Sequence, residues 1–344
     1  MKDCVLFSKL SDNSVQCSAC SHRCTIKDGA MGICGVRKNY KGNLKLLAWG
    51  KPTGVAIDPI EKKPLFHFLP GSPIFSFGTF GCNLGCLFCQ NATTSQLSKT
   101  AFWKTKYSQF LEQLESWPAK KIISYCKENN IPSIAFTYNE PSIFAEYAVD
   151  VMKLAQKEGI KGVFVSNGYQ TKECLDFIEP YIDAYNIDLK SFRNDFYKAI
   201  CKASLLPVLE TIKRIYEMGK WLEITTLIIN KENDTDKELA DIAQFIARLS
   251  PDIPWHLSRC HPEYKMTDIR ITPKSTLERA VEIGKNAGLH YIYVGNIYNS
   301  KYENTLCPTC DTTLIVRNNY DIGKNNMKRG ICPSCHAQIP GIWH

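Results

Sequence analysis

Three closely spaced cysteines lie in the sequence Phe80-Gly81-Cys82-Asn83-Leu84-Gly85-Cys86-Leu87-Phe88-Cys89-Gln90-Asn91, which we call the cluster loop. It follows the apolar run Pro73 to Phe80, which predicts a strand that leads into the loop. The three cysteines are spaced C-x3-C-x2-C, so they can bind three irons of a [4Fe–4S] cluster and leave the fourth iron open. A closed structural zinc site would need a fourth ligand. The flanking residues Gly81 and Gly85 tolerate the backbone angles of a tightly curled loop.

The composition is that of a globular protein with many cysteines. Of 344 residues, 44% are hydrophobic and 22% charged, which excludes collagenous, coiled-coil and wholly disordered proteins. No long apolar run follows Lys2, so we expect a cytoplasmic protein without membrane association. In a reducing compartment, the 16 cysteines favour metal binding over disulfides. The net charge of +8 contains no long basic block and identifies no partner.

Beyond the cluster loop, strand-like and helical runs alternate. Ile143, Tyr147, Val151 and Leu154 recur at steps of three and four residues, which predicts a helix lying on a sheet. The strand-like runs cover residues 133–138, 162–166, 184–189, 222–229, 254–257 and 291–294. With the strand before the cluster loop, they predict an α/β fold: a partial TIM-type (β/α) barrel of about six to seven parallel strands.

The cluster loop resembles that of the radical S-adenosylmethionine (SAM) superfamily, in which a C-x3-C-x2-C loop follows the first strand of a partial barrel. The resemblance implies that Cys82, Cys86 and Cys89 hold a [4Fe–4S] cluster whose open iron chelates SAM. Residues 70–297 are similar to the activating enzymes of glycyl-radical enzymes, including pyruvate formate-lyase. Nearly the whole chain resembles the radical SAM enzyme of the AmmeMemoRadiSam system. The motifs that carry this resemblance are TYNEP (137–141), SNGY (166–169), DLKSF (188–192), EITTLII (223–229), PWHLSR (254–259) and YVGN (293–296).

The resemblance also implies a set of SAM-binding residues at the carboxyl ends of the predicted strands. A zwitterionic methionine tail and a ribose require a carboxylate, a cation or amide, and hydroxyl-binding groups. Glu140 matches the residue that meets the methionine ammonium, and His261 matches a histidine near the adenine. The complete predicted set is Asn139, Glu140, Ser166, Asn167, Asp188, Lys190 and His261. Singly, each has a structural explanation, such as a helix cap at Asn139 or a surface pair between Asp188 and Lys190.

Two positions depart from the activating enzymes. Those enzymes carry Asp-Thr-Asn-Gly where this chain has Val165-Ser166-Asn167-Gly168, so a cation site that uses the aspartate is not carried over. They also carry an arginine where Glu223 falls, so part of their ligand geometry does not transfer.

A carboxyl-terminal segment, residues 301–344, contains two C-P-x-C pairs separated by 21 residues. The pairs are Cys307 with Cys310 and Cys332 with Cys335. Two such pairs that close on one tetrahedral ion are typical of a zinc ribbon, and zinc would stabilise a segment with few core residues. We therefore predict structural zinc rather than iron here.

An amino-terminal segment, residues 1–69, contains a second group of four cysteines, spaced C-x2-C-x3-C-x9-C at Cys17, Cys20, Cys24 and Cys34. This spacing fits either zinc or an auxiliary iron–sulfur cluster, and ligands could also be shared between the terminal segments. The barrel is predicted between them, over residues 70–300. The other cysteines are isolated and are expected to be small buried apolar residues; they are Cys4, Cys126, Cys174, Cys201 and Cys260.

The predicted function is that of a radical SAM enzyme. A flavodoxin or ferredoxin would reduce the cluster, SAM would be cleaved to methionine and a 5′-deoxyadenosyl radical, and the radical would abstract hydrogen from a protein or other macromolecule. No catalytic residue is assigned beyond the cluster ligands. A Memo-like partner protein is one expectation, and activation of a glycyl-radical enzyme is the alternative. A rival of another class is a metal-stabilised module that binds nucleic acid or protein, with Lys324, Lys328 and Arg329 in the interface.

Overall fold

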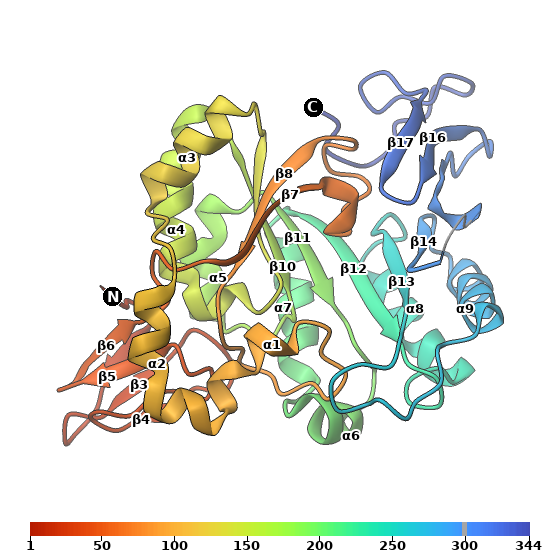
Figure 1. The fold of residues 1–344 in the computed structure, drawn as a ribbon. Coiled ribbons are helices and arrows are strands. Elements are labelled where there is room, and N and C mark those ends of the chain that lie inside the picture. Colours follow the sequence, from red (N-terminus) through yellow and green to blue (C-terminus); the bar gives the residue numbers. More distant parts are fainter. Residues whose placement is uncertain (298–300) are drawn as a thin grey trace.

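The computed structural model describes residues 1–297 and 301–344, so the predicted boundary at residue 300 lies outside the described residues. An eight-stranded sheet in the order β14-β13-β12-β11-β10-β9-β8-β7 forms the centre of the protein (Figure 1). Its parallel strands are β8 (Pro73–Gly78), β9 (Ser133–Phe136), β10 (Lys161–Ser166), β11 (Ala184–Asp188), β12 (Trp221–Ile228), β13 (Trp255–Arg259) and β14 (Ile292–Gly295). The predicted α/β partial barrel is confirmed, and each predicted strand is present.

One strand of the sheet was not predicted. β7 (Thr53–Pro59) pairs antiparallel with β8 and extends the edge of the sheet. It comes from within residues 1–69, which the sequence assigned to the amino-terminal extension. Gly54 and Pro59 interrupt its pattern, and both residue types are uncommon inside strands.

Helices follow the strands, and several of them pack against the sheet. Of the predicted apolar stripe, Tyr147, Val151 and Leu154 lie in α4, where the first two are fully buried and Leu154 is half-buried. Ile143 is also buried, but it lies in the 3-10 turn just before that helix. The helices are α1 (Ala92–Ser95), α2 (Ala101–Gln113), α3 (Ala119–Glu128), α4 (Ala145–Ala155), α5 (Lys172–Ile178), α6 (Asn194–Phe196), α7 (Leu206–Glu217), α8 (Asp236–Leu249) and α9 (Lys274–Asn286). Short turns of 3-10 helix are Ile60–Lys62, Leu97–Lys99, Pro141–Phe144, Gln156–Glu158, Glu179–Tyr181 and Lys301–Glu303, and Tyr197–Cys201 is a π-helical turn.

A row of aromatic rings forms the core beneath these helices. The ring of Phe136 on β9 lies 5.2 Å from that of Phe77 on β8 and 5.4 Å from that of Phe164 on β10, measured between centroids. Both pairs are edge-on, the favourable arrangement of aromatic quadrupoles. Ring packing of this kind fixes the strands whose carboxyl ends carry the candidate site.

The two terminal segments lie at opposite ends of the barrel (Figure 1). The amino-terminal segment forms two small sheets, β1 (Lys2–Asp3) with β5 (Arg37–Tyr40) and β6 (Asn43–Leu46), and β2 (Phe7–Lys9) with β3 (Val15–Cys17) and β4 (Thr25–Ile26). The carboxyl-terminal segment forms β15 (Thr305–Leu306), β16 (Thr313–Asn318) and β17 (Asp321–Asn325). The last residues of the segment contact residues that precede β8: the Ile342 amide donates a hydrogen bond of 2.7 Å to the His67 carbonyl.

No helix in residues 1–297 or 301–344 is both long and apolar enough to cross a membrane.

Candidate active site

A cavity of about 390 Å³ lies at the carboxyl ends of the parallel strands. Cys82, Cys86 and Cys89 all contribute to its wall, and so do four of the predicted SAM-binding residues: Asn139, Asn167, Asp188 and Lys190. Three thiols without a fourth cysteine in the loop could bind three irons of such a cluster and leave the fourth iron without a protein ligand. The residues present therefore fit a [4Fe–4S] cluster with one open iron.

The start of the cluster loop is fixed by Gly81 and Asn139. Gly81 has a φ of 77°, which glycine adopts without strain, whereas Gly85 is not among the residues with positive φ. The Asn139 side chain donates to the Gly81 carbonyl at 2.8 Å and accepts from the Thr79 amide at 3.2 Å. Asn139 therefore holds the start of the cluster loop in place through these two hydrogen bonds.

Cys201, which is isolated from other cysteines in the sequence, lies against the cluster loop. The Gly85 amide donates to the Cys201 carbonyl at 2.9 Å, and the Leu87 amide donates to the Ile200 carbonyl at 3.1 Å. A hydrogen bond with the Cys201 thiol lowers the pKa of Cys86 to about 7 and raises the pKa of Cys201. Because the thiolate is the form that binds iron, this contact favours metal binding at Cys86. No sequence spacing links the two residues, so the contact could not be predicted.

The other two cluster-loop cysteines have different surroundings. Burial raises the pKa of Cys82, and it also raises the pKa of Cys89, whose sulfur lies 3.0 Å from the Ser95 hydroxyl. Both thiols would lose their protons when iron binds, because metal ligation requires the thiolate.

Glu140 and Ser166 lie behind the cavity wall. The buried Glu140 carboxylate accepts hydrogen bonds from the Ser166 hydroxyl at 2.9 Å and from the Asn167 amide at 2.8 Å. Burial raises the pKa of Glu140 despite these bonds. The Asn167 side chain reaches the cavity and donates to Asn83 Oδ1 at 2.8 Å. Glu140 thus shapes the turn after β10, and its contact with a methionine ammonium stays a prediction.

Asp188 and Lys190 form an ion pair in the cavity wall, with Lys190 Nζ 2.8 Å from Asp188 Oδ2. Burial alone would lower the pKa of Lys190, but the charges of Asp188 and Cys86 raise it above its ordinary value. Lys190 therefore remains cationic at neutral pH and can face a carboxylate. The pair is not the exposed surface pair of the alternative explanation, because the Lys190 side chain is only 11% exposed.

His261 is exposed and does not line the cavity, so the adenine contact that the resemblance implies stays a prediction.

A different histidine, His256, lines the cavity from β13. Its Nε2 atom lies 2.5 Å from Glu223 Oε2, and Glu223 also accepts from the backbone amides of Phe66 and His67. The sequence does contain a signal for His256, because it alternates with Ser258 near the end of a predicted strand and alternate residues of a strand share one face.

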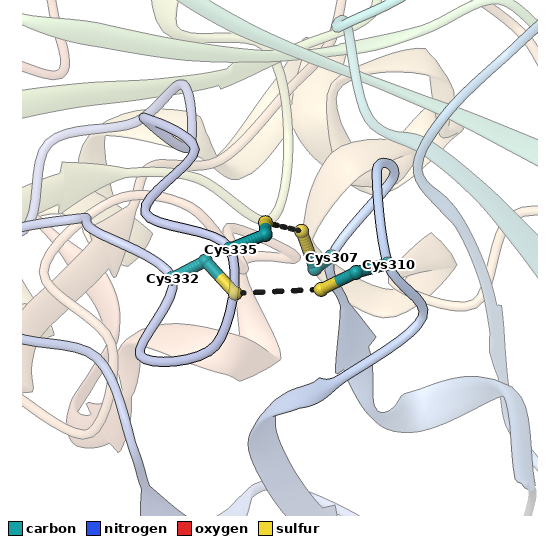
Figure 2. Close-up of side chains that lie close together, drawn as sticks. All are labelled: Cys307, Cys310, Cys332 and Cys335. Carbon is teal, nitrogen blue, oxygen red and sulfur yellow. Dashed lines mark hydrogen bonds between the residues drawn. The ribbon is translucent and has the colours of Figure 1, made fainter.

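The four cysteines of the carboxyl-terminal segment form one group, whose sulfurs all lie within 4.8 Å of one another (Figure 2). The Cys307 and Cys335 sulfurs are 3.5 Å apart, and those of Cys310 and Cys332 are 3.7 Å apart. A tetrahedral ion with metal–sulfur bonds of about 2.3 Å separates its ligands by roughly 3.8 Å. Hydrogen bonding with Thr312 lowers the pKa of Cys310 to about 6. The segment therefore has the ligands and the spacing of a metal site.

The four cysteines of the amino-terminal segment are also brought together. Cys17, Cys20, Cys24 and Cys34 line one small cavity of about 10 Å³. Cys17, Cys20 and Cys34 are each 6% exposed. The two terminal cysteine groups share no ligand in the described residues, since the carboxyl-terminal four form their group alone.

Comparisons with known proteins agree with this geometry. The family model for the Radical SAM superfamily matches residues 77–246. The chain is 41% identical over 318 residues to uncharacterized protein MJ0808 of Methanocaldococcus jannaschii, with 92% of each chain covered. It is 23% identical over 209 residues to pyruvate formate-lyase-activating enzyme of Clostridium pasteurianum, covering 56% of this chain and 82% of that protein.

Among solved structures, the fold is similar to that of a radical SAM methyltransferase from Sphaerobacter thermophilus. The TM-score is 0.50 at 14% sequence identity, with 68% of each chain covered. This likeness concerns the fold alone. The cluster loop, the parallel sheet with its cavity and the family match lead to one conclusion: the chain belongs to the radical SAM superfamily.

Proposed function

We propose that this radical SAM enzyme binds a [4Fe–4S] cluster on Cys82, Cys86 and Cys89 and abstracts hydrogen from a macromolecular substrate. The observation that carries the proposal is that these three thiols line the same cavity as Asn167 and Lys190. When bound, the reduced cluster supplies one electron that cleaves SAM to methionine and a 5′-deoxyadenosyl radical, which takes a hydrogen atom from the substrate.

The residues of the chain bind and orient SAM. Lys190 provides a buried cation for the methionine carboxylate, and Asp188 keeps that cation in place. Asn167 provides amide hydrogen-bonding groups close to Cys82, since its Nδ2 atom lies 3.9 Å from the Cys82 sulfur. The apolar wall residues Leu84 and Leu227 exclude water, which would otherwise compete for a reactive intermediate.

The size of the cavity supports a macromolecular substrate. Its volume of about 390 Å³ is near the lower end of the range for ligand cavities, roughly 300–1,000 Å³. SAM would fill most of that space, so only a small part of a substrate can enter. The rim includes the exposed residues Lys62, Asn91, Asn296 and Tyr320, on which the rest of a large substrate can lie.

A deuterium-transfer experiment tests this proposal. Lysate from the source organism grown in deuterated medium is separated by size into macromolecules and small molecules, and each fraction is incubated with reduced enzyme and unlabelled SAM. Mass spectrometry should find deuterium in 5′-deoxyadenosine only with the macromolecular fraction. Transfer from the small-molecule fraction alone would contradict a macromolecular substrate, and a Cys82, Cys86 and Cys89→Ala triple variant is the control.

Activation of a glycyl-radical enzyme is a second candidate, supported by the sequence similarity to a pyruvate formate-lyase-activating enzyme. Membership of the AmmeMemoRadiSam system, a Memo-like partner protein and a flavodoxin or ferredoxin reductant also remain proposals. Electron paramagnetic resonance (EPR) separates the candidates, because a glycyl-radical substrate would acquire a stable radical signal. Zinc is the metal we propose for Cys307, Cys310, Cys332 and Cys335, since their sulfur spacing fits a tetrahedral ion.

A further inference from the structure

We propose that the carboxyl-terminal segment, residues 301–344, completes the substrate-binding part of the active site, where Glu61 and Tyr320 receive a hydrogen-bond-donating group of the substrate. The inference rests on the proposed function, because it identifies where the substrate of that reaction is held. The segment is then a part of the active site rather than a separate metal-stabilised module.

The first observation is the position of the segment at the open side of the barrel. In the described residues, β7 and β14 are the two edges of the central sheet and do not pair with each other. Residues 60–68 follow β7 and reach β14, since the Phe66 ring lies 4.6 Å from the Tyr293 ring between centroids. The guanidinium of Arg317, on β16, lies 4.2 Å from the centre of the Phe66 ring. The segment therefore packs over the gap between the two edge strands.

The second observation is that the metal site and the cavity wall share one core. Cys307 and Cys332, the two buried cysteines of the carboxyl-terminal group, belong to the same cluster of buried side chains as Phe66 and Tyr293. Both Phe66 and Tyr293 line the cavity. Arg317 Nη2 also donates to the Phe66 carbonyl at 2.7 Å. A metal that fixes the two buried cysteines thus also fixes this part of the cavity wall.

Tyr320 brings the segment directly to the cavity. It lies in the turn between β16 and β17, and it lines the cavity although the residue is 41% exposed. A side chain that meets both the cavity and the solvent lies at the mouth, where a substrate must pass. Tyrosine offers an apolar ring together with a hydroxyl that donates and accepts hydrogen bonds. The Asn319 amide, which donates to Glu303 Oε2 at 2.8 Å, holds this turn in place.

Glu61 provides a carboxylate oxygen without a partner. The residue is fully buried, yet it lines the cavity. Its Oε1 atom accepts from the Gly71 amide at 3.0 Å and lies 3.6 Å from Arg317 Nε, whereas Oε2 has no hydrogen-bond partner among the described residues. A buried acceptor without a partner is costly, so such atoms are normally satisfied by protein, water or ligand. Water can serve in the empty cavity, and a substrate group that donates a hydrogen bond replaces it.

The neighbouring charges leave this acceptor available. Lys62 and Lys63 directly follow Glu61, but both pair with Asp58, at 2.9 Å and 2.5 Å. Arg317 donates to backbone carbonyls and to a hydroxyl, and its Nε atom stays beyond hydrogen-bond distance of the carboxylate. The group that fits Glu61 is therefore a hydrogen-bond donor: a cation such as an ammonium, or a neutral amide or hydroxyl.

The coupling of SAM cleavage to substrate tests the role of Glu61. Reduced enzyme is given unlabelled SAM and a subsaturating amount of the fraction from deuterated cells that donates deuterium, and deuterated 5′-deoxyadenosine is divided by total 5′-deoxyadenosine. Glu61→Gln keeps an acceptor oxygen but loses the charge. The ratio should fall about tenfold or more if the substrate group is a cation, and about threefold if it is neutral. An unchanged ratio would overturn the assignment.

Glu146→Gln is the matched control for Glu61→Gln. Glu146 is also a buried carboxylate paired with an arginine, Arg37, but it does not line the cavity. We expect this variant to keep the ratio of the original protein. An equal fall in both variants would show a general loss of packing and would also overturn the assignment.

Tyr320→Ala removes an exposed side chain, so it keeps the proposal testable even if Glu61→Gln does not fold. The same ratio should fall by about threefold or more, because the substrate loses a contact at the mouth of the cavity. Tyr216→Ala is the matched control, at a tyrosine of α7 that is 42% exposed and does not line the cavity. Equal ratios in the two variants would contradict the role of Tyr320.

Hydrogen–deuterium exchange tests the structural link without catalysis. In Cys310→Ser, with loss of the carboxyl-terminal metal checked by metal analysis, residues 60–69 should exchange faster, because Arg317 no longer holds the Phe66 carbonyl. The strands β9 and β10 should exchange as in the original protein. Unchanged exchange in residues 60–69 would overturn the link. If the enzyme cleaves SAM but neither the ratios nor the exchange rates change, the proposed function stands and only this inference fails.

Discussion

The carboxylate of Glu223 lies 2.5 Å from Nε2 of His256, and both residues are buried in the wall of the barrel. Burial opposes ionisation of Glu223, but its hydrogen bonds, above all that with His256, hold the pKa of this carboxyl below its usual value. The ionised carboxylate also accepts from the amides of Phe66 and His67 and from the Trp221 indole. Glu223 thus orients His256, which lines the cavity, and anchors the segment that contains Phe66 and His67.

Replacement of Glu223 should therefore be costly. Glu223→Ala leaves several buried donors without an acceptor, and we expect the free energy of unfolding to fall by about 3 kcal/mol. Chemical denaturation of the metal-loaded protein measures this change. Glu282→Ala is the matched control, because Glu282 is exposed and its ion pair with Lys285 lies at the surface, so it should cost less than about 1 kcal/mol. Equal losses in the two variants would contradict the anchoring role.

The close approach of Cys34 to Gly81 gives a second prediction. Gly81→Ala introduces both a strained positive φ and a clash with the Cys34 carbonyl, whereas Gly29→Ala, with a φ of 74°, introduces the strain alone. We expect Gly29→Ala to cost about 1 kcal/mol and Gly81→Ala clearly more, since a buried backbone contact must also give way. Thermal unfolding of the two variants measures the difference. If the two melt together, the segments are not in tight contact.

His67 gives the protein a pH-dependent stability. Its Nδ1 lies 2.8 Å from the Pro340 carbonyl and its Nε2 lies 2.6 Å from the Tyr293 hydroxyl, an arrangement that suits the neutral ring. Burial lowers the pKa of His67 to about 4. The unfolded chain, in which His67 has its ordinary pKa of about 6.5, binds more protons between these two values, so stability falls as the pH drops from about 6.5 to 4.

The expected loss from His67 over this range is roughly 3 kcal/mol. Urea unfolding at pH 7 and pH 5 measures the slope, and His67→Gln, which cannot titrate, separates this residue from all other groups. The variant should lose less stability on acidification than the original protein. An identical slope in both proteins would show that His67 does not contribute.

Removal of metal from the carboxyl-terminal site should loosen residues 301–344 selectively. Cys310→Ser, or a chelator strong enough to extract zinc, deprives this small sheet of its main constraint, and we expect rapid proteolysis within the segment while the barrel stays resistant. Mass spectrometry of the fragments locates the cuts. Thr309→Ser, which changes a residue inside the same C-P-x-C pair but no ligand, should behave like the original protein. Resistance of the metal-free protein would mean that packing alone holds the segment.

Much of the fold was predictable because its signals are local. The parallel strands are short apolar runs that each bury a sheet face, and the cluster loop follows one of them directly. β7 was missed because Gly54 and Pro59 hide it, and only its pairing with β8 reveals it. Antiparallel pairing between sequence neighbours depends on tertiary contacts that a single pattern does not encode.

The candidate site was predictable in part for the same reason. Asn167, Asp188 and Lys190 lie at or just after strand ends, and they line the cavity as expected. Glu140 also follows a strand, but its carboxylate lies behind the cavity wall, where it accepts a hydrogen bond from the backbone amide of Asn167. The contact between Cys86 and Cys201 spans more than a hundred residues, so it depends on how the π-helical turn packs.

The three cluster-loop thiols should support reductive cleavage of SAM, and an anaerobic assay with purified protein tests this. The protein is reconstituted with iron and sulfide, reduced with titanium(III) citrate and supplied with SAM, and 5′-deoxyadenosine is quantified beside the Cys82, Cys86 and Cys89→Ala variant. We expect 5′-deoxyadenosine from the original protein and none from the variant. An intact, reduced cluster that yields no 5′-deoxyadenosine, or equal yields from both proteins, would contradict the account.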